Sequence, residues 1–166
     1  MAGKSTVKIA KKLQEMLPGP YEVFYDHGVK SERNVCECKA TIDQELSRLT
    51  AIAGIDIAVL REDKVILLIE IEEKKTLSPK VFFGDYVTMQ MVNHVFIDKK
   101  RYDVTPLTRF VIGGLAEAKG SSKSKLANLE EELAAKMQKP RQIDLIVKDH
   151  ASDLTKAVID ATATLL

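Results

Sequence analysis

The residues with the clearest chemical potential are three carboxylates in two neighbouring apolar segments. Asp56 interrupts the apolar run of residues 54–60, and residues 65–72 end in Glu70-Ile71-Glu72. In the second segment the odd-numbered positions are all apolar, whereas the even-numbered positions change from Ile and Leu to Glu. Side chains of a strand alternate between the two faces of a sheet, so Glu70 and Glu72 are expected on one face.

A hairpin between the two segments would bring these carboxylates together. The odd-numbered positions form the more apolar face of each segment. If these two faces are to pack into the same core, odd-numbered positions of one segment must pair with odd-numbered positions of the other. A three-residue turn at 62–64 meets this condition and pairs Ile57 with Ile69. The same register places Asp56 opposite Glu70, with Cβ atoms roughly 5 Å apart, and Glu72 one step further along.

Three converging carboxylates repel one another unless a cation lies between them. Mg²⁺ or Mn²⁺ is the simplest such cation, because both accept all-oxygen sites made of two carboxylates, water and a substrate phosphate. A metal held in this way can activate water and neutralise a phosphoryl transition state. The alternative is that Glu70 and Glu72 are the solvent face of a strand, with Lys74 and Lys75 nearby. Asp56 weakens that alternative, because a carboxylate within a buried run needs a partner.

Periodicity and turn residues predict the elements that must position these carboxylates. Helices are expected at residues 5–17, 42–50, 78–94, 126–137 and 152–165, and strands at 21–25, 54–60, 65–72, 109–115 and 143–147. The early strands favour antiparallel pairing, and the later helical crossovers favour parallel neighbours. We therefore expect one α/β domain over residues 1–166, with a mixed central sheet flanked by helices.

At Ile55-Asp56 and Glu70-Ile71-Glu72 the chain resembles the PD-(D/E)xK nuclease superfamily. The resemblance implies a restriction-endonuclease-like three-layer core, made of a helix, a β-meander, a crossover helix and a parallel strand. It covers about residues 41–115, followed by a C-terminal α-β-α extension at about 122–166. It also implies that Asp56 and Glu70 bind the metal, that Glu72 binds it or acts as a base, and that Glu45 on the preceding helix assists a second ion.

Glu72 occupies the position at which the superfamily motif has lysine. Some restriction enzymes of this superfamily carry glutamate there and cleave with two metals. A lysine from elsewhere could also supply the positive charge. Lys74 is the next residue on the same strand face, and Lys80 lies in the first turn of the following helix; Lys80 is the preferred candidate.

The resemblance implies a metal-dependent nuclease that hydrolyses phosphodiesters with metal-activated water, with DNA expected in preference to RNA. The residues expected to contact the nucleic-acid backbone are Lys74, Lys75, Lys99, Lys100 and Arg101, although a solvated turn also explains the last three. One alternative is a non-catalytic interaction or DNA-binding module, for example a subunit of a larger complex. Another is a metal site for different phosphate chemistry, such as nucleotide hydrolysis.

Composition restricts the partners further. The 166-residue chain has a formal net charge of +1, which excludes a globally basic nucleic-acid-binding protein but not a local basic patch. Aromatic residues are 5% and Trp is absent, which argues against a large base-stacking platform. No apolar run approaches the roughly 20 residues of a membrane span, and residues 1–12 do not have the pattern of a secretory signal. We expect a cytoplasmic protein without a membrane partner, and a homodimer if it cuts both strands of a duplex.

Cys36 and Cys38 are the only cysteines. A disulfide across a single residue has poor geometry, and no second Cys/His pair follows at zinc spacing. We therefore expect two reduced thiols on a strand or loop.

Overall fold

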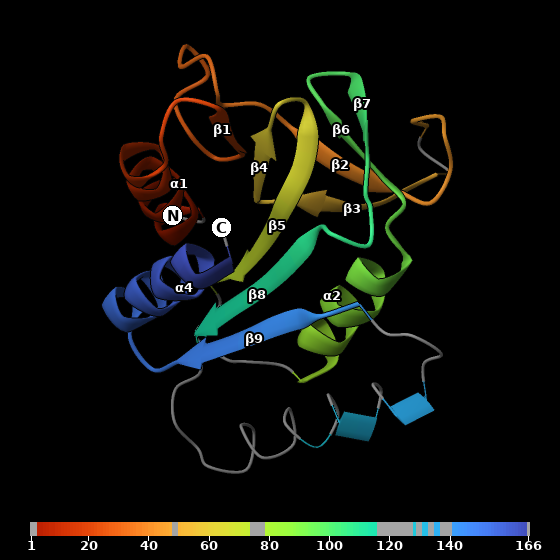
Figure 1. The fold of residues 1–166 in the computed structure, drawn as a ribbon. Helices are drawn as coiled ribbons and strands as arrows, with labels where there is room; N and C mark the ends of the chain where they lie inside the picture. Colours follow the sequence, from red (N-terminus) through yellow and green to blue (C-terminus); the bar gives the residue numbers. More distant parts are fainter. Residues whose placement is uncertain are drawn as a thin grey trace.

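The computed structural model of the chain describes residues 3–47, 50–73, 79–115, 128, 131–132, 135–136 and 141–165 (Figure 1). Its elements are α1 (Lys4–Met16), β1 (Tyr21–Tyr25), β2 (Cys38–Thr41), β3 (Ala51–Ile55), β4 (Ile57–Arg61), β5 (Lys64–Glu72), α2 (Pro79–Met91), β6 (His94–Ile97), β7 (Lys100–Asp103), β8 (Arg109–Leu115), β9 (Ile143–Lys148) and α4 (Ala151–Leu165). The first and last predicted helices, and the strands predicted at 21–25, 65–72, 109–115 and 143–147, are confirmed to within one residue at each end.

The main sheet is mixed, as the sequence predicts. Its five strands follow the order β1-β4-β5-β8-β9. The first three strands form an antiparallel meander, whereas β8 and β9 run parallel to β5. Helix α2 connects β5 to β8, which is the crossover that a parallel pair requires. The described chain is therefore an α/β fold with a mixed central sheet between helices.

Two apolar cores lie on opposite faces of this sheet. On one face, α1 and α4 lie together against the strands (Figure 1). Their core contains Ile9, Leu13, Val111, Leu154 and Val158. On the other face, Phe82 of α2 packs with strand residues such as Leu68 and Ile112 and with the inner face of a second sheet. At the centre of β5, the even-numbered apolar positions face one of these cores and the odd-numbered apolar positions face the other.

The second sheet is a feature that the sequence analysis missed. It is antiparallel, with the strand order β3-β2-β6-β7. Two separate insertions build it: β2 and β3 lie between β1 and β4 in the chain, and β6 and β7 lie between α2 and β8. The single strand predicted at 54–60 is wrong, because the chain leaves the second sheet after Ile55 and enters the main sheet at Ile57.

The helix predicted at 42–50 is also wrong. Residues 42–45 form a bend in the connection between β2 and β3. The Thr41 hydroxyl donates to the Asp43 carbonyl oxygen at 2.7 Å, and the Thr50 hydroxyl donates to that of Glu45 at 2.6 Å. Short polar side chains that bond to nearby backbone in this way compete with helix formation. The pattern that resembled a helix cap therefore belongs to a loop.

Two other predicted helices differ in extent from what the structure describes. Helix α2 ends at Met91 instead of His94, because the Asn93 amide donates to the Thr41 carbonyl oxygen at 2.9 Å and the chain then enters β6. Of the helix predicted at 126–137, residues 128, 131–132 and 135–136 are described and all of them are helical, whereas the other positions lie outside the described residues. None of the helices in the described part of the chain has the length and apolar character needed to cross a membrane.

The turn between β4 and β5 contains two residues, one fewer than predicted. Glu62 and Asp63 both have positive φ, 50° and 61°, which is the conformation of a type I′ hairpin turn. Arg61 therefore pairs with Lys64, and a bulge near Ile66 restores the pairing of Val59 with Leu67. The register predicted next to Asp56 and Glu70 is confirmed as far as the pairing extends, since Ile57 pairs with Ile69.

Gly114 of β8 provides a test of the packing between α2 and the main sheet. A Cβ atom at this position would overlap the ring of Phe82, which is buried at 1% exposure. We expect Gly114→Ala to lower the free energy of unfolding by about 1–3 kcal/mol, because the ring must move within a filled core. Denaturant titration measures this change. Gly54→Ala is the matched control, since it is also in a strand but has open space around its Cβ position; an equal loss in both variants would contradict the prediction.

Candidate functional site

Asp56 and Glu70 lie side by side, as the sequence predicts. The Asp56 amide donates a hydrogen bond to Glu70 Oε2 at 3.2 Å. The Ile71 amide donates to Asp56 Oδ2 at 2.8 Å. The Asp56 side chain is only 14% exposed, and Glu70 is partly buried. The two carboxylates therefore form one hydrogen-bonded unit at the end of β5.

This arrangement follows from the change of sheet at Asp56. The pairing of β4 with β5 ends at Ile57 and Ile69, so no backbone carbonyl of β4 reaches the Ile71 amide. The Asp56 carboxylate accepts that hydrogen bond instead, which satisfies a backbone donor that would otherwise be costly to bury. The Asp56 carbonyl oxygen accepts from the Asp26 amide at 3.0 Å and extends the contact to β1.

The surroundings of Asp56 and Glu70 raise the pKa of both carboxyl groups. Burial raises the pKa of Asp56 to about 6, although the Ile71 amide and His27 act in the opposite direction. Burial also raises the pKa of Glu70 well above its usual value, and the charges of Asp56 and Asp85 add to this effect. A cation between the two groups would reverse this effect, because it stabilises both ionised forms.

His27 and Glu73 complete the surroundings of the pair, and the sequence analysis did not assign either of them to it. His27 Nε2 lies 3.6 Å from Asp56 Oδ1, and its backbone has a positive φ of 65°. Glu73 accepts hydrogen bonds from the amides of Lys4 and Ser5 at the beginning of α1. A carboxylate at a helix N-terminus is favourable, so Glu73 attaches α1 to the end of β5. His27 is 29 residues from Asp56 in the chain, and Glu73 is more than 60 residues from Lys4 and Ser5. No local sequence pattern indicates either contact.

The other acidic candidates differ in their distance from the pair. Glu72 is partly buried on the face of β5 that carries Glu70, and its charge contributes to the raised pKa of Glu70. Glu45 lies in the loop that joins β2 to β3, whereas Asp56 follows the opposite end of that hairpin. The predicted helical position of Glu45 beside the metal is therefore corrected: the structure does not bring Glu45 to the carboxylate pair.

Lys80, Lys74 and Lys75 are not placed at the pair. Lys80 is exposed in the first turn of α2, and within the described residues no hydrogen bond or ion pair joins it to Asp56 or Glu70. Lys74 and Lys75 lie outside the described residues.

The basic cluster at 99–101 forms the tip and first part of the β6–β7 hairpin. All three side chains are exposed, but two of them are engaged. Lys100 Nζ lies 2.7 Å from Asp63 Oδ1, so this pair connects the tips of two hairpins. Arg101 donates to the Gln44 carbonyl oxygen at 3.4 Å. Of the three, Lys99 has the fewest contacts within the described structure.

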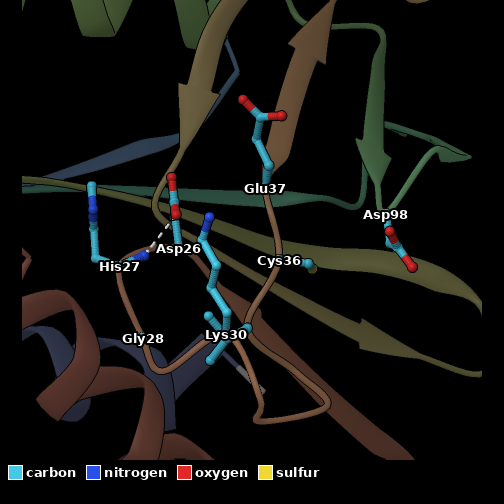
Figure 2. Close-up of a pocket in the computed structure, with 8 residues that line it drawn as sticks. Asp26, His27, Gly28, Lys30, Cys36, Glu37 and Asp98 are labelled. Carbon is cyan, nitrogen blue, oxygen red and sulfur yellow. Dashed lines mark hydrogen bonds between the residues drawn. The ribbon is translucent and has the colours of Figure 1, made fainter.

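An open pocket of about 670 Å³ is lined in part by His27, the residue that lies 3.6 Å from Asp56. Figure 2 shows its walls, which come from the loop after β1, the segment leading into β2 and the β6–β7 turn. Its lining residues are Asp26, His27, Gly28, Lys30, Val35, Cys36, Glu37 and Asp98. Neither Asp56 nor Glu70 lines this pocket, but His27 belongs both to its wall and to the surroundings of Asp56.

The donor set at the pair is compatible with a divalent metal that shares its coordination with substrate. Among the described residues, no three His, Cys, Asp or Glu side chains form a group that could hold a metal by themselves. Mg²⁺ needs only one or two protein carboxylates when water and phosphate oxygens fill its other positions. Asp56 and Glu70 fit that requirement.

The raised pKa of Asp56 predicts a specific dependence of stability on pH. Because the folded-state pKa of about 6 exceeds the ordinary value of 3.8, the folded chain binds more protons between these values. The Asp56 contribution therefore favours folding at low pH and is lost as pH rises through about 6. We expect Asp56→Asn to be more favourable relative to wild type at pH 7 than at pH 4, by about 2–3 kcal/mol at most.

Urea unfolding of both proteins at the two pH values measures this difference. Asn retains an oxygen for the Ile71 amide, so the comparison isolates the charge. Asp160→Asn, an exposed position in α4, should show no such change. An Asp56→Asn effect of the same size at both pH values would disprove the prediction.

No family model, curated protein or solved structure matches this chain. The features that bear on function are therefore the carboxylate pair, its electrostatics and the order of the elements around it.

Proposed function

We propose that this protein is a metal-dependent nuclease that hydrolyses phosphodiester bonds in DNA. The observation that carries the proposal is the pair formed by Asp56 and Glu70, two partly buried carboxylates within one hydrogen-bond network. Such a pair is electrostatically unfavourable when both groups are ionised, and a divalent cation is the simplest partner for it.

The order of the elements supports the same proposal. Helix α1 precedes the β1-β4-β5 meander, and α2 then crosses to β8, which is parallel to β5. This is the order of a restriction-endonuclease-like core, with Asp56 and Glu70 on the second and third strands of the meander or next to them. In this interpretation the core begins at α1, and the second sheet consists of two insertions into it. The region of likeness then extends over residues 4–115, beyond the segment from about 41 indicated by the sequence.

In the proposed reaction, Asp56 and Glu70 would hold Mg²⁺ or Mn²⁺, and water and the substrate phosphate would supply the other ligands. The bound ion would lower the pKa of a water molecule and neutralise charge on the phosphate. The Ile71 amide keeps Asp56 in place through Oδ2, while Oδ1 faces His27. Glu72 is proposed as an additional ligand or a base, because it lies on the same face of β5.

The proposed contacts to the nucleic-acid backbone are Lys99, Lys100 and Arg101 at the β6–β7 tip, together with Lys74 and Lys75. Lys80, which is exposed at the beginning of α2, is proposed to supply the positive charge that the motif lysine provides in the superfamily. This role requires Lys80 to approach the phosphate once substrate is bound.

A second candidate function is a non-catalytic interaction or DNA-binding module with the same fold. The observation that favours it is Glu72 in the position of the motif lysine, together with a Lys80 side chain that makes no contact with either carboxylate in the described structure. The two functions differ in whether the carboxylate pair supports cleavage.

We expect cleavage to require Mg²⁺ or Mn²⁺ and to fall on the order of 100-fold or more in Asp56→Asn and Glu70→Gln, because each change removes a charged ligand. The assay measures cutting of single-stranded, duplex and branched DNA and of RNA by wild type and both variants. Asp160→Asn is the control for charge removal away from the pair. Metal-dependent cutting that survives in both folded variants would exclude this site, and absence of cutting on every substrate would favour the non-catalytic module.

Metal binding can be tested without cleavage. We expect Mn²⁺ to raise the melting temperature of wild type at pH 7, because a ligand that binds only the folded state stabilises it. The increase should be lost in Asp56→Asn and Glu70→Gln and retained in Asp160→Asn, as measured by calorimetry. Equal increases in all four proteins would show that Mn²⁺ binds elsewhere.

A further inference from the structure

His27 brings a nitrogen atom to the carboxylate pair that the metal chemistry described above does not use. Its Nε2 atom lies 3.6 Å from Asp56 Oδ1, and its side chain is 44% exposed. This separation is too long for a hydrogen bond. The other oxygen of the same carboxylate, Oδ2, accepts the hydrogen bond from the Ile71 amide. Asp56 therefore directs one oxygen to the backbone of β5 and the other to the imidazole ring.

Contacts from two segments of the chain hold His27 in this position. The Asp26 amide donates to the Asp56 carbonyl oxygen at 3.0 Å, and Asp26 Oδ1 accepts from the His27 amide at 2.7 Å (dashed line in Figure 2). In addition, Gly3, immediately before α1, lies so close that a Cβ atom there would overlap the His27 side chain. The imidazole is therefore placed at Asp56 by the fold and not by the ring contact alone.

The spacing of the two facing atoms is close to that of two ligands on one metal ion. Two ligand atoms that are each about 2.1 Å from an ion lie about 3.0 Å apart in octahedral geometry and about 3.4 Å apart in tetrahedral geometry. The separation between His27 Nε2 and Asp56 Oδ1 exceeds these values by only about 0.2–0.6 Å. No three potential ligands are preassembled among the described residues, so a bound ion would complete the site by drawing the exposed imidazole toward Asp56.

An imidazole ligand changes which ions a carboxylate site selects. Mg²⁺ is a hard cation that prefers oxygen ligands, whereas imidazole nitrogen suits transition-metal ions. Asp56 and Glu70 by themselves offer only oxygen. A nitrogen ligand beside them raises the affinity for transition-metal ions and adds little to the affinity for Mg²⁺.

We propose that His27 binds the metal ion of the carboxylate pair through Nε2, and that this ligand makes the site selective for a divalent transition-metal ion over Mg²⁺. His27 Nε2 and Asp56 Oδ1 then bind the same ion, and Glu70, water and a substrate phosphate supply further ligands. This inference rests on the metal site of the proposed function, but it does not require that the site cleave nucleic acid.

The test compares the affinities of the full chain for Mg²⁺, Mn²⁺ and Co²⁺ by titration calorimetry at pH 7. The variant is His27→Asn, because Asn adopts the positive φ of this position more readily than most residues. We expect the Mn²⁺ and Co²⁺ affinities to fall on the order of tenfold or more, since even partners of metal ligands contribute that much, and the Mg²⁺ affinity to change little. His150→Asn, which removes an exposed imidazole between β9 and α4, is the matched control and should change none of the three.

A second measurement tests the ligand bond directly in wild type and applies even if His27→Asn fails to fold. Imidazole bound to Co²⁺ gives a contact-shifted NMR signal for its remaining ring N–H. We expect this signal from His27, retained in His150→Asn and lost in Asp56→Asn.

The outcomes separate this inference from the proposed function. An equal loss of affinity for all three ions in His27→Asn would show a structural role and overturn the inference, as would unchanged affinities or a wild-type preference for Mg²⁺. Metal binding that requires Asp56 and Glu70 but gives no contact-shifted His27 signal would overturn the inference alone. If wild type binds none of the three ions, the proposed metal site is wrong and the inference is wrong with it.

Discussion

The hydrogen bond between the Ile71 amide and the Asp56 carboxylate is the interaction on which the rest of the structure depends. At this point the chain leaves one sheet and enters another, and β5 continues beyond the end of its partner β4. A side-chain oxygen replaces the missing backbone acceptor. Because the Asp56 oxygen accepts this hydrogen bond, two sheets can meet at one residue without an unsatisfied buried amide. The same hydrogen bond holds the Asp56 carboxylate in a partly buried position beside Glu70.

The electrostatic properties of the site follow from that constraint. Asp56 cannot move into solvent without releasing the Ile71 amide, and Glu70 is held by the Asp56 amide. Burial of both groups raises their pKa values. Within the part of the chain that the structure describes, the pair has one ion-pair contact to a cationic candidate, His27, which is 3.6 Å from Asp56 and 44% exposed. Sites with this kind of electrostatic imbalance are characteristic of functional regions.

The second sheet gives the site its surroundings. Its two hairpins come from distant parts of the chain and are joined through the pairing of β2 with β6. An exposed ion pair between Lys100 and Asp63 joins the tip of the second hairpin to the β4–β5 turn. Cys36, Asp98 and the loop after β1 form a pocket whose wall includes His27. Arg141 attaches the beginning of β9 to the C-terminal end of α2 through the carbonyl oxygens of Met89 and Val92.

The sequence by itself determined four of the five strands of the main sheet, β1, β5, β8 and β9, and the meeting of Asp56 with Glu70 at the end of the hairpin. Alternation of apolar residues with a period of two specifies which side of a strand is buried, and this condition allowed one pairing. Only the tertiary structure decided where the second sheet forms and which groups surround the pair. Glu73 meets α1, His27 meets Asp56, and Cys36 meets the β6–β7 turn. The physical reason is that local patterns encode burial and turns, whereas the partner that covers a buried face is chosen by packing between segments far apart in the chain.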